Sequence, residues 1–310
     1  MKVLMITGDK NFKPGHPRYD LQAGAVEKLA VVYWGRGSAS WRMWSKIPKG
    51  HFDVVTAQDP LWRGHLAAHL AWLLGAKLNL QVHTDLSALS SLLRWWAAFN
   101  LRKADSVRVV SEKIKQQVEH MHVRAKITLL PIFIDIERFR AIQHMPHLLV
   151  QAGEQKTILW VGRFEAEKDP LHALSVLKKV READVDTRLV LLGAGNLEKS
   201  LRAESVRLSL TDSVEFPGWQ DPVQYLAIAD VMVCTSLHES WGASIIEALA
   251  AGVPVVAPDV GVAREAGAVV VPREQLVETV VDVLQKGTRG TLRLHMLSKE
   301  EWASAWVKTL

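Results

Sequence analysis

Two successive series of short apolar segments run through the chain, and this pattern constrains the fold more than any other feature. In the first series, the segments alternate with stretches of helical periodicity near residues 62–75, 88–103 and 111–122. Strands are expected at 2–7, 29–34, 53–56, 78–83, 106–110 and 126–130. Apolar strands separated by helices are typical of a parallel sheet that is covered on both faces.

The same alternation starts again after residue 156. Its strands are expected at 157–161, 188–192, 214–216, 231–235, 253–257 and 269–271. A chain of 310 residues exceeds the size at which one core stops growing, roughly 250–300 residues. We therefore predict an α/β protein with two Rossmann-like parallel-sheet domains, residues 1–145 and 146–295, joined where periodicity fades over 141–155.

The last segment has the pattern of a well-capped helix. Ser298 and Glu301 have capping-box spacing, and Trp302 and Trp306 are four residues apart. Residues 296–310 are predicted to form a closing helix that packs on the body.

Charge is distributed unevenly between the two halves. Residues 1–140 contain 21 Lys and Arg against 11 Asp and Glu, whereas residues 141–310 contain 17 against 22. A basic first half favours an anionic partner such as a phosphate-bearing acceptor, an acidic membrane or nucleic acid. A solvated basic surface is the equally weighted alternative.

The sequence also limits the setting of the protein. Its only cysteine, Cys234, lies in an apolar run, so no disulfide framework is available. The apolar run at residues 3–6 is too short for a secretory signal, and residues 66–82 contain His69 and Lys77. We expect a cytoplasmic protein, with the inner face of the plasma membrane as an alternative setting.

Two carboxylates, Glu239 and Glu247, are separated by seven residues at a predicted junction between a loop and a helix. Gly242 would let the backbone approach a ligand closely, and the amides at the helix start, near Ala243 and Ser244, can meet phosphate oxygens. The segment therefore has the outline of a nucleotide-phosphate site.

A second candidate site follows the strand at 157–161. Gly162 is expected to expose its backbone amide, Arg163 offers a forked donor, and Lys168 supplies a mobile point charge. A diphosphate leaving group needs such stabilisation as its charge develops. Ordinary surface salt bridges are the alternative for either cation alone.

Together these residues resemble the retaining glycosyltransferases of family 4, which have the GT-B architecture of two Rossmann-like domains facing across a cleft. The resemblance covers nearly the whole chain and is strongest in the Glu239–Glu247 pair followed by the sequence ALAAGVPVVA. Further landmarks lie at residues 81–85, 110–112, 135–139, 161–163, 192–195, 216–219 and 229–236.

The resemblance implies roles for individual residues. Arg163 and Lys168 would bind the donor diphosphate, Glu247 the ribose hydroxyls, and Glu239 the transferred sugar. His83 would reach that sugar from the first domain, although a buried core histidine is the alternative. The remaining donor-side residues would be Gly162, Phe216, Trp219, Trp241, Gly242, Ala243 and Ser244, and the acceptor-side residues Gly8 and Asp85.

Two departures from the family affect the acceptor side. Many relatives carry a glycine pair after the first strand, where only Gly8 is well placed here, and the usual Asn-Gly before Asp135 is replaced by Phe133-Ile134. The base would be read by backbone groups near 216–219, so uracil and guanine are not distinguished. Trp219 could stack on a ring or pack against the sheet edge.

Other motifs compete with this interpretation. The Gly193-Ala194-Gly195 turn resembles a dinucleotide fingerprint but lacks its third glycine, which argues against a nicotinamide cofactor. Asp184 and Asp186 form an Asp-x-Asp pattern that we interpret as turn acids, and we expect no metal because two cations would replace it.

The segment 34–49 contains four cations, three tryptophans and no acid. It could dock on anionic lipid, hold a lipid-phosphate acceptor or stack single-stranded nucleic acid, or its tryptophans could fill the core.

We therefore predict that the protein is an enzyme that transfers a sugar from a nucleoside diphosphate donor to an acceptor hydroxyl with retention of anomeric configuration. The acceptor would be a carbohydrate or a lipid-linked sugar of polysaccharide or glycolipid synthesis; neither a cofactor nor nucleic acid is expected to take part. A sugar-nucleotide epimerase or hydrolase on the same scaffold, or a non-catalytic binding module, are the alternatives.

Overall fold

The computed structural model describes residues 1–35, 50–143 and 155–310, which form two compact units. The first unit contains residues 1–133 and 297–310, and the second contains residues 134–296. The predicted domain boundary at residue 145 lies outside the described residues. Helix α6 (Glu137–Gln143), just before it, belongs to the second unit.

The first unit is built on a six-stranded parallel sheet in the order β2-β1-β3-β4-β5-β6. Its strands are β1 (Lys2–Thr7), β2 (Lys28–Tyr33), β3 (Val54–Ala57), β4 (Lys77–Val82), β5 (Ser106–Val109) and β6 (Lys126–Leu129). All six strands of the first predicted series are confirmed.

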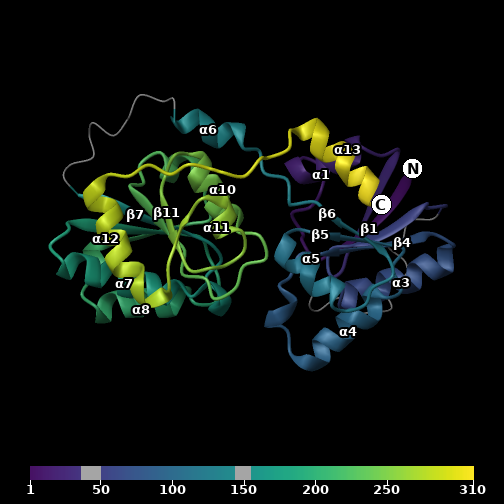
Figure 1. Cartoon of the computed structure of the whole chain (residues 1–310), viewed down its shortest axis with the longest axis horizontal. Helices are drawn as coiled ribbons and strands as arrows, with labels where there is room; N and C mark the ends of the chain where they lie inside the picture. Colours follow the sequence, from purple (N-terminus) through teal and green to yellow (C-terminus); the bar gives the residue numbers. More distant parts are fainter. Residues whose placement is uncertain (36–49, 144–154) are drawn as a thin grey trace. The chain divides into compact units, whose positions relative to one another are not determined.

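Helices cover both faces of this sheet (Figure 1). One face carries α3 (Trp62–Leu74), α4 (Ser91–Leu101) and α5 (Glu112–Glu119), and the other carries α1 (Pro17–Gly24) and α13 (Lys299–Thr309). From β1 to β2 the chain moves in one direction along the sheet, and from β3 to β6 it moves in the other. Because both kinds of connection are right-handed, their helices lie on opposite faces of the sheet. Helix α1 was not expected, because its eight residues carry no clear apolar stripe.

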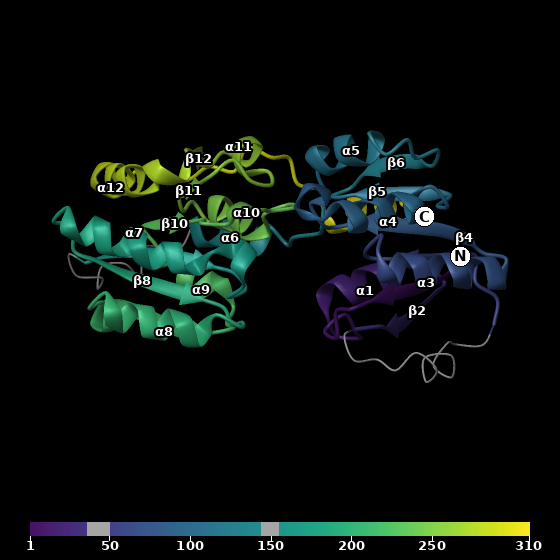
Figure 2. The same ribbon diagram turned by 90° about the horizontal axis from the view of Figure 1, so that it is seen from below.

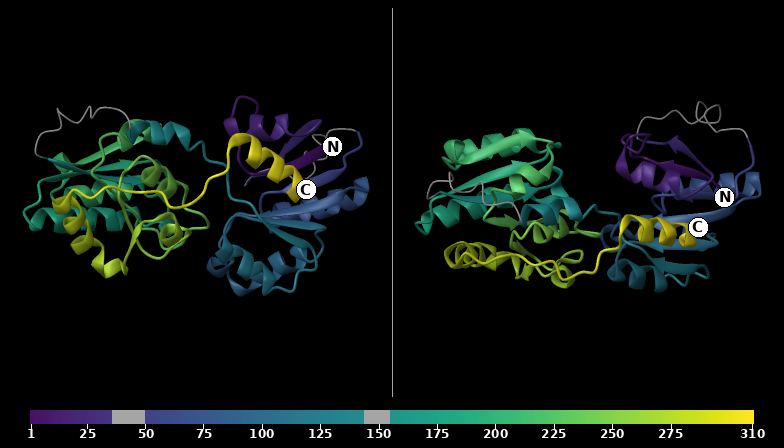
Figure 3. Two further views of the ribbon diagram at one scale, coloured as in Figure 1. Left: turned by 45° about the horizontal axis from the view of Figure 1, so that its top comes forward. Right: turned by 90° about the horizontal axis from the view of Figure 1, so that it is seen from above.

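The predicted closing helix is confirmed as α13, which packs on the first unit beside α1 (Figure 3). Ser298 and Glu301 form the capping box. Trp302 and Trp306 are almost completely buried in a cluster with Met5, Phe12, Leu21 and Leu130. The C-terminal residues therefore complete the apolar core around β1.

Arg108 fixes the same region from within β5. Its buried guanidinium donates hydrogen bonds to Gln81 (2.9 Å), the Leu130 carbonyl (2.9 Å) and the Pro131 carbonyl (2.7 Å). It also lies 5.1 Å from the ring of Trp302, whose indole N–H donates to the Pro131 carbonyl. Burial, with a smaller contribution from Arg18, lowers the pKa of Arg108 to about 9.

The second unit contains another six-stranded parallel sheet, in the order β12-β11-β10-β7-β8-β9. Its strands are β7 (Lys156–Val161), β8 (Thr187–Leu192), β9 (Val214–Gly218), β10 (Val231–Val233), β11 (Val255–Ala257) and β12 (Val269–Val270). The second predicted series is thus confirmed, and with it the α/β fold of two parallel sheets.

Three helices, α7 (Pro170–Glu182), α8 (Glu198–Arg207) and α12 (Leu276–Lys286), cover one face of this sheet and supply most of its core (Figures 1 and 2). Helices α9 (Pro222–Leu226) and α10 (Ala243–Ala250) lie with α6 on the other face (Figure 2), and α11 (Ala263–Ala266) contacts α10. No helix within the described ranges is long and apolar enough to cross a membrane.

Candidate active site

The loop after β7 begins with Gly162, and its backbone is already paired. The Gly162 amide donates to the Leu192 carbonyl at 3.0 Å, so the expectation that this amide is exposed is wrong. A side chain at this position would lie 3.0 Å from the Trp160 ring. Packing against the tryptophan beneath the loop therefore favours glycine at this position.

The Gly193-Ala194-Gly195 turn packs directly on this loop. A Cβ atom on Gly193 would lie 1.8 Å from the Gly162 carbonyl oxygen, and one on Gly195 would lie 2.6 Å from the Phe164 carbonyl oxygen. The Phe164 amide donates to the Ala194 carbonyl at 2.9 Å. Close packing of two loops thus accounts for these glycines without a dinucleotide.

Lys168 and Glu239 meet at the carboxyl edge of the second unit's sheet. The Lys168 Nζ lies 2.5 Å from Glu239 Oε1, which also accepts a hydrogen bond from the Ser236 hydroxyl at 2.8 Å. Both charged side chains are largely buried, with 18% and 10% of their surface exposed. The structure therefore brings together two residues that the sequence predicted for one site.

The backbone next to Lys168 is held by residues that the sequence did not identify. The Thr235 hydroxyl contacts the carbonyls of Lys168 (3.0 Å) and Asp169 (2.8 Å). Arg273 pairs with the Asp169 carboxylate and donates to the Thr235 carbonyl. Asp169 has φ +44°, a conformation that non-glycine residues adopt at a cost, and these bonds stabilise it. A lone arginine after β12 carries no motif that would have revealed this role.

Arg163 occupies a more open position. Its guanidinium pairs with Glu167 at 2.7 Å, and the two side chains are 60% and 42% exposed. Because such an exposed pair contributes little stability, a stronger anion can displace Glu167 at small cost. Arg163 is thus accessible to a ligand on the same loop as Lys168.

Helix α10 begins immediately after the loop that contains Glu239. Gly242, with φ +94°, is its N-cap. The first amides of a helix, here those of Ala243 and Ser244, have no partner within the helix and attract anions. The indole N–H of Trp241 is buried without a hydrogen-bond partner. This group of donors can bind an anionic, oxygen-rich ligand.

Glu247 lies on α10, one turn beyond Ser244, and is partly buried. Burial is the main reason that its pKa is raised, to about 7; Asp221 adds to this rise and Arg138 opposes it. Near neutral pH this carboxyl group is therefore present in both its protonated and its ionised form. In the ionised form it can accept hydrogen bonds from ligand hydroxyls.

Phe216 lies within β9, and Trp219 directly follows this strand. The Phe216 ring packs against the core and lies 4.6 Å from the Arg202 guanidinium. Trp219 is 60% exposed, so much of its ring is accessible to a ligand.

In the first unit, His83 directly follows β4. Its Nε2 atom is buried and makes no hydrogen bond. Burial lowers the pKa of His83 to about 3, and the charges of Arg108 and Arg18 contribute. The imidazole is therefore neutral at physiological pH, with one unpaired nitrogen, unlike a core histidine whose hydrogen bonds are satisfied.

Asp85, two residues further on, is fully engaged in local structure. It accepts hydrogen bonds from the Ser87 amide (2.9 Å) and hydroxyl (2.6 Å), from Gln117 (2.8 Å) and from Lys113 (2.9 Å). Burial acts to raise the pKa of Asp85, but these hydrogen bonds outweigh it and hold the pKa at about 2. Both oxygens stabilise the loop after β4, which leaves the predicted acceptor-side role without support from this geometry.

Gly8, the other predicted acceptor-side residue, is covered by Arg63. A Cβ atom there would lie 2.0 Å from the Arg63 guanidinium, which pairs with Asp59 and donates to the Trp34 carbonyl. The absence of a side chain at Gly8 therefore leaves space for the Arg63 guanidinium.

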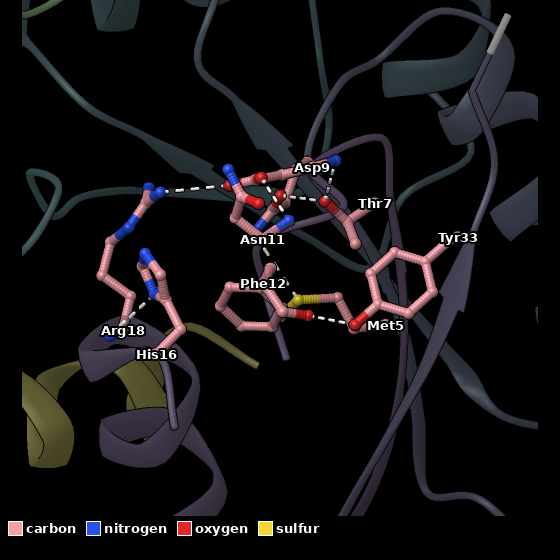
Figure 4. A network of polar contacts seen from close by, with 9 residues as sticks. Met5, Thr7, Asp9, Asn11, Phe12, His16, Arg18 and Tyr33 are labelled. Carbon is pink, nitrogen blue, oxygen red and sulfur yellow. Dashed lines mark hydrogen bonds and ion pairs between the residues drawn. The ribbon is translucent and has the colours of Figure 1, made fainter. Parts of the chain in front are cut away.

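Side chains organise the remainder of this loop where many relatives would carry glycine (Figure 4). The Thr7 hydroxyl donates to Gln58 at 2.6 Å and accepts from the Asp9 amide at 3.0 Å. Asp9 in turn pairs with Arg18 at 3.1 Å. The loop after β1 is thus fixed by side-chain contacts.

Asp186, from the Asp-x-Asp pattern, is the turn acid that the sequence predicted. Asp186 accepts hydrogen bonds from Gln155 (3.0 Å) and Arg181 (3.3 Å) in the turn before β8, as expected of a turn acid. The basic, tryptophan-rich segment 34–49 lies, beyond residue 35, outside the described residues.

Comparison with known protein families gives two adjacent matches. The family described as "Glycosyltransferase Family 4" matches residues 15–138, and that described as "Glycosyl transferases group 1" matches residues 146–289. Together they span both units.

Individual relatives agree with these matches. Glycogen synthase of Mycobacterium tuberculosis is 29% identical over 203 residues, which are 64% of this chain and 45% of that enzyme. The lipopolysaccharide core biosynthesis glycosyltransferase LpsE of Rhizobium meliloti is 27% identical over 74% of this chain and 70% of its own length. The chain thus spans less than half of the glycogen synthase that it matches.

Solved structures show the same fold. HepE of Anabaena, crystallised with UDP-glucose, has a TM-score of 0.72 at 18% identity and covers 92% of this chain and 89% of its own. Sucrose-phosphate synthase of Thermosynechococcus elongatus has a TM-score of 0.71 at 16% identity and covers 100% and 95%. With both units matched by family and by fold, the chain belongs to the family 4 glycosyltransferases and has the GT-B fold.

Proposed function

We propose that this protein transfers a sugar from a nucleoside diphosphate donor to an acceptor hydroxyl with retention of anomeric configuration. The observation that carries the proposal is the direct contact of Lys168 with Glu239 beside the helix start at Gly242. A cation, a carboxylate and helix amides are the groups that a sugar diphosphate requires.

In this proposal Lys168 and Arg163 bind the diphosphate and stabilise its charge as the glycosidic bond breaks. Glu239 accepts hydrogen bonds from the transferred sugar, and the ionised Glu247 accepts them from the ribose hydroxyls. The backbone around Phe216 and the exposed Trp219 contact the base. Neutral His83 hydrogen-bonds the sugar or the incoming acceptor, and attack occurs on the face from which the phosphate departs.

The acceptor is proposed to be a carbohydrate or lipid-linked hydroxyl in polysaccharide or glycolipid synthesis. LpsE, a lipopolysaccharide core biosynthesis glycosyltransferase, supports this setting by similarity. A cytoplasmic location agrees with Cys234, which is buried as a thiol.

A thermal-shift screen with UDP, GDP, ADP and their sugars tests donor binding, since a ligand that binds the native state raises its melting temperature. The bound donor is then incubated with and without sugar acceptors, and NMR identifies the anomer formed. Retention in an acceptor-dependent product supports the proposal. An inverted product, turnover by water alone, or donor binding without any turnover contradicts it.

A further inference from the structure

Two neighbouring helices of the first unit expose an unusual number of large apolar side chains. Trp72 on α3 is 76% exposed and Trp95 on α4 is 63% exposed. We call the exposed group the α3–α4 face, which consists of Trp62, Trp72, Leu73, Leu92, Trp95 and Phe99. Apolar side chains that gather in one place on a surface mark an interaction site more often than scattered ones do.

The spacing of most of these residues aligns them on one side of each helix. Trp62 and Trp72 of α3 are linked through His65 and His69 by intervals of three and four residues, and Leu73 lies next to Trp72. Leu92, Trp95 and Phe99 follow the same intervals on α4. The two helices lie side by side and contact each other (Figure 2). The ring centroids of Trp62 on α3 and Trp96 on α4 are 3.9 Å apart. The face is therefore continuous across both helices.

The charge around this face is net positive. Residues 59–105 contain five Lys and Arg and three acids, and each acid has a partner. Asp59 pairs with Arg63, Asp85 pairs with Lys113, and Asp105 accepts a hydrogen bond from the Leu78 amide at 2.7 Å. Lys103 lies 4.2 Å from the Phe99 ring, so a cation sits directly beside the apolar side chains. Neither helix contains an acidic residue. The partner of this face is expected to be anionic.

We propose that the α3–α4 face binds the surface of a membrane that contains anionic lipids. Tryptophans favour the headgroup region, leucines enter the acyl boundary, and lysine and arginine meet the lipid phosphates. A second copy of this chain would bring like charges together across a symmetric interface. Single-stranded nucleic acid would stack on the rings, but its bases leave Leu73 and Leu92 without an apolar partner.

The α3–α4 face contains none of the residues assigned to donor binding and none of the segment 34–49. Membrane binding takes place through two helices of the first unit, and the protein lies on the bilayer surface.

Co-sedimentation of the full chain with vesicles tests the proposal. One set contains phosphatidylcholine alone and the other contains roughly one third phosphatidylglycerol, at low and high salt. We expect binding to the anionic vesicles, weakened by salt. Trp72→Gln should weaken vesicle binding about tenfold because it removes an aromatic side chain from the headgroup region. Lys103→Glu should weaken it about tenfold because it reverses a charge next to the lipid phosphates.

Matched substitutions on α8 of the second unit serve as controls. Val206→Gln replaces another exposed apolar side chain, and Lys199→Glu reverses another exposed charge. Both should leave vesicle binding unchanged, and thermal melting should show that all four variants are folded.

Several results would overturn the proposal. The first is that the wild-type chain does not bind vesicles, or binds both lipid mixtures equally. The second is that Trp72→Gln and Lys103→Glu have no effect while substitution of Trp41 and Trp44 abolishes binding, which would assign membrane binding to the segment 34–49. The third is that the protein forms a dimer that does not bind vesicles and that Trp72→Gln dissociates, which would make the face a contact between copies.

Discussion

Lys168 and Glu239 form an ion pair of 2.5 Å although they come from loops that follow different strands, β7 and β10. Ser236 shares the same carboxylate oxygen. A diphosphate that binds Lys168 competes with Glu239 for the ammonium group. Donor binding is thus coupled to the freedom of the carboxylate that we assign to the sugar.

This pair can be tested by a double-mutant cycle. Lys168→Met should lower the free energy of unfolding by about 2 kcal/mol, because it leaves a largely buried carboxylate without its counter-charge. Adding Glu239→Gln should recover most of that loss. Urea unfolding measures each value. Arg163→Met, which breaks an exposed pair, is the control and should cost less than about 0.5 kcal/mol. Additive effects of Lys168→Met and Glu239→Gln would show that the pair is not coupled.

Arg163 should nevertheless be essential for the donor. Arg163→Glu is expected to abolish the thermal shift produced by the nucleoside diphosphate, because it places a negative charge beside the phosphates. Arg207→Glu provides the control, since Arg207 is also an exposed arginine and pairs with Glu204 on α8. An undiminished shift in Arg163→Glu would remove this residue from the phosphate site.

The raised pKa of Glu247 predicts a pH dependence of stability. The native state retains a proton that the unfolded state has lost between about pH 4.5 and 7, so stability from this group decreases as pH rises through that window. Glu247→Gln should therefore be more stable than the wild type by up to about 3 kcal/mol near pH 8 and by little near pH 4.5. Chemical denaturation at both pH values measures the difference, and an equal gain at both would contradict it.

The same group predicts how nucleotide affinity depends on pH. Ribose hydroxyls donate to the ionised carboxylate, so nucleotide binding should strengthen as pH rises through about 7. Calorimetry compares the wild type with Glu247→Gln, in which the ligand phosphate still titrates but the carboxylate does not. Parallel affinity curves for the two proteins would place Glu247 away from the ribose.

His83 should act as a neutral hydrogen-bonding group. Its pKa of about 3 predicts that the transfer rates of the wild type and of His83→Asn have pH profiles of the same shape between about pH 6 and 8. His83→Ala should reduce turnover by roughly 10²-fold, the scale of one lost transition-state hydrogen bond. An inflection near pH 6.5 that disappears in His83→Asn would show that the imidazole titrates during catalysis.

The glycine turn after β8 predicts a large effect of one methyl group. Gly193→Ala should destabilise the protein by roughly 3 kcal/mol or more, because the Cβ atom would overlap the Gly162 carbonyl oxygen at a φ of +151°. Gly24→Ala, at the open end of α1, should be neutral or slightly stabilising. Thermal melts compare the two, and similar melting temperatures would contradict the observed loop contact.

Local patterns were sufficient to predict both sheets and the closing helix. Each expected strand of the first sheet lies within one residue of the observed one, since apolar runs in buried parallel strands are long and distinct. Helix α1 escaped prediction because PRYDLQAG is short and contains only two clearly apolar side chains besides its proline, which by itself would have favoured a helix start. Its position depends on tertiary packing against α13, which lies far away in sequence.

Prediction of the site was limited in the same way. Motif spacing identified Lys168 and Glu239, and the structure shows that they meet. Spacing did not reveal that Arg273 contacts Asp169, since the two lie more than a hundred residues apart in sequence. It also did not reveal that both carboxylate oxygens of Asp85 are hydrogen-bonded to other residues of the first unit. Such contacts arise only when distant loops converge, so neither residue type nor spacing encodes them.

The placement of α13 also has a consequence for synthesis on the ribosome. Residues 1–133 emerge first, yet Met5, Phe12 and Leu21 have no complete apolar covering until Trp302 and Trp306 have been translated. Residues 134–296 suffer no such delay, because their core lies within one continuous stretch. The half that leaves the ribosomal tunnel first is therefore the half whose apolar core is completed last.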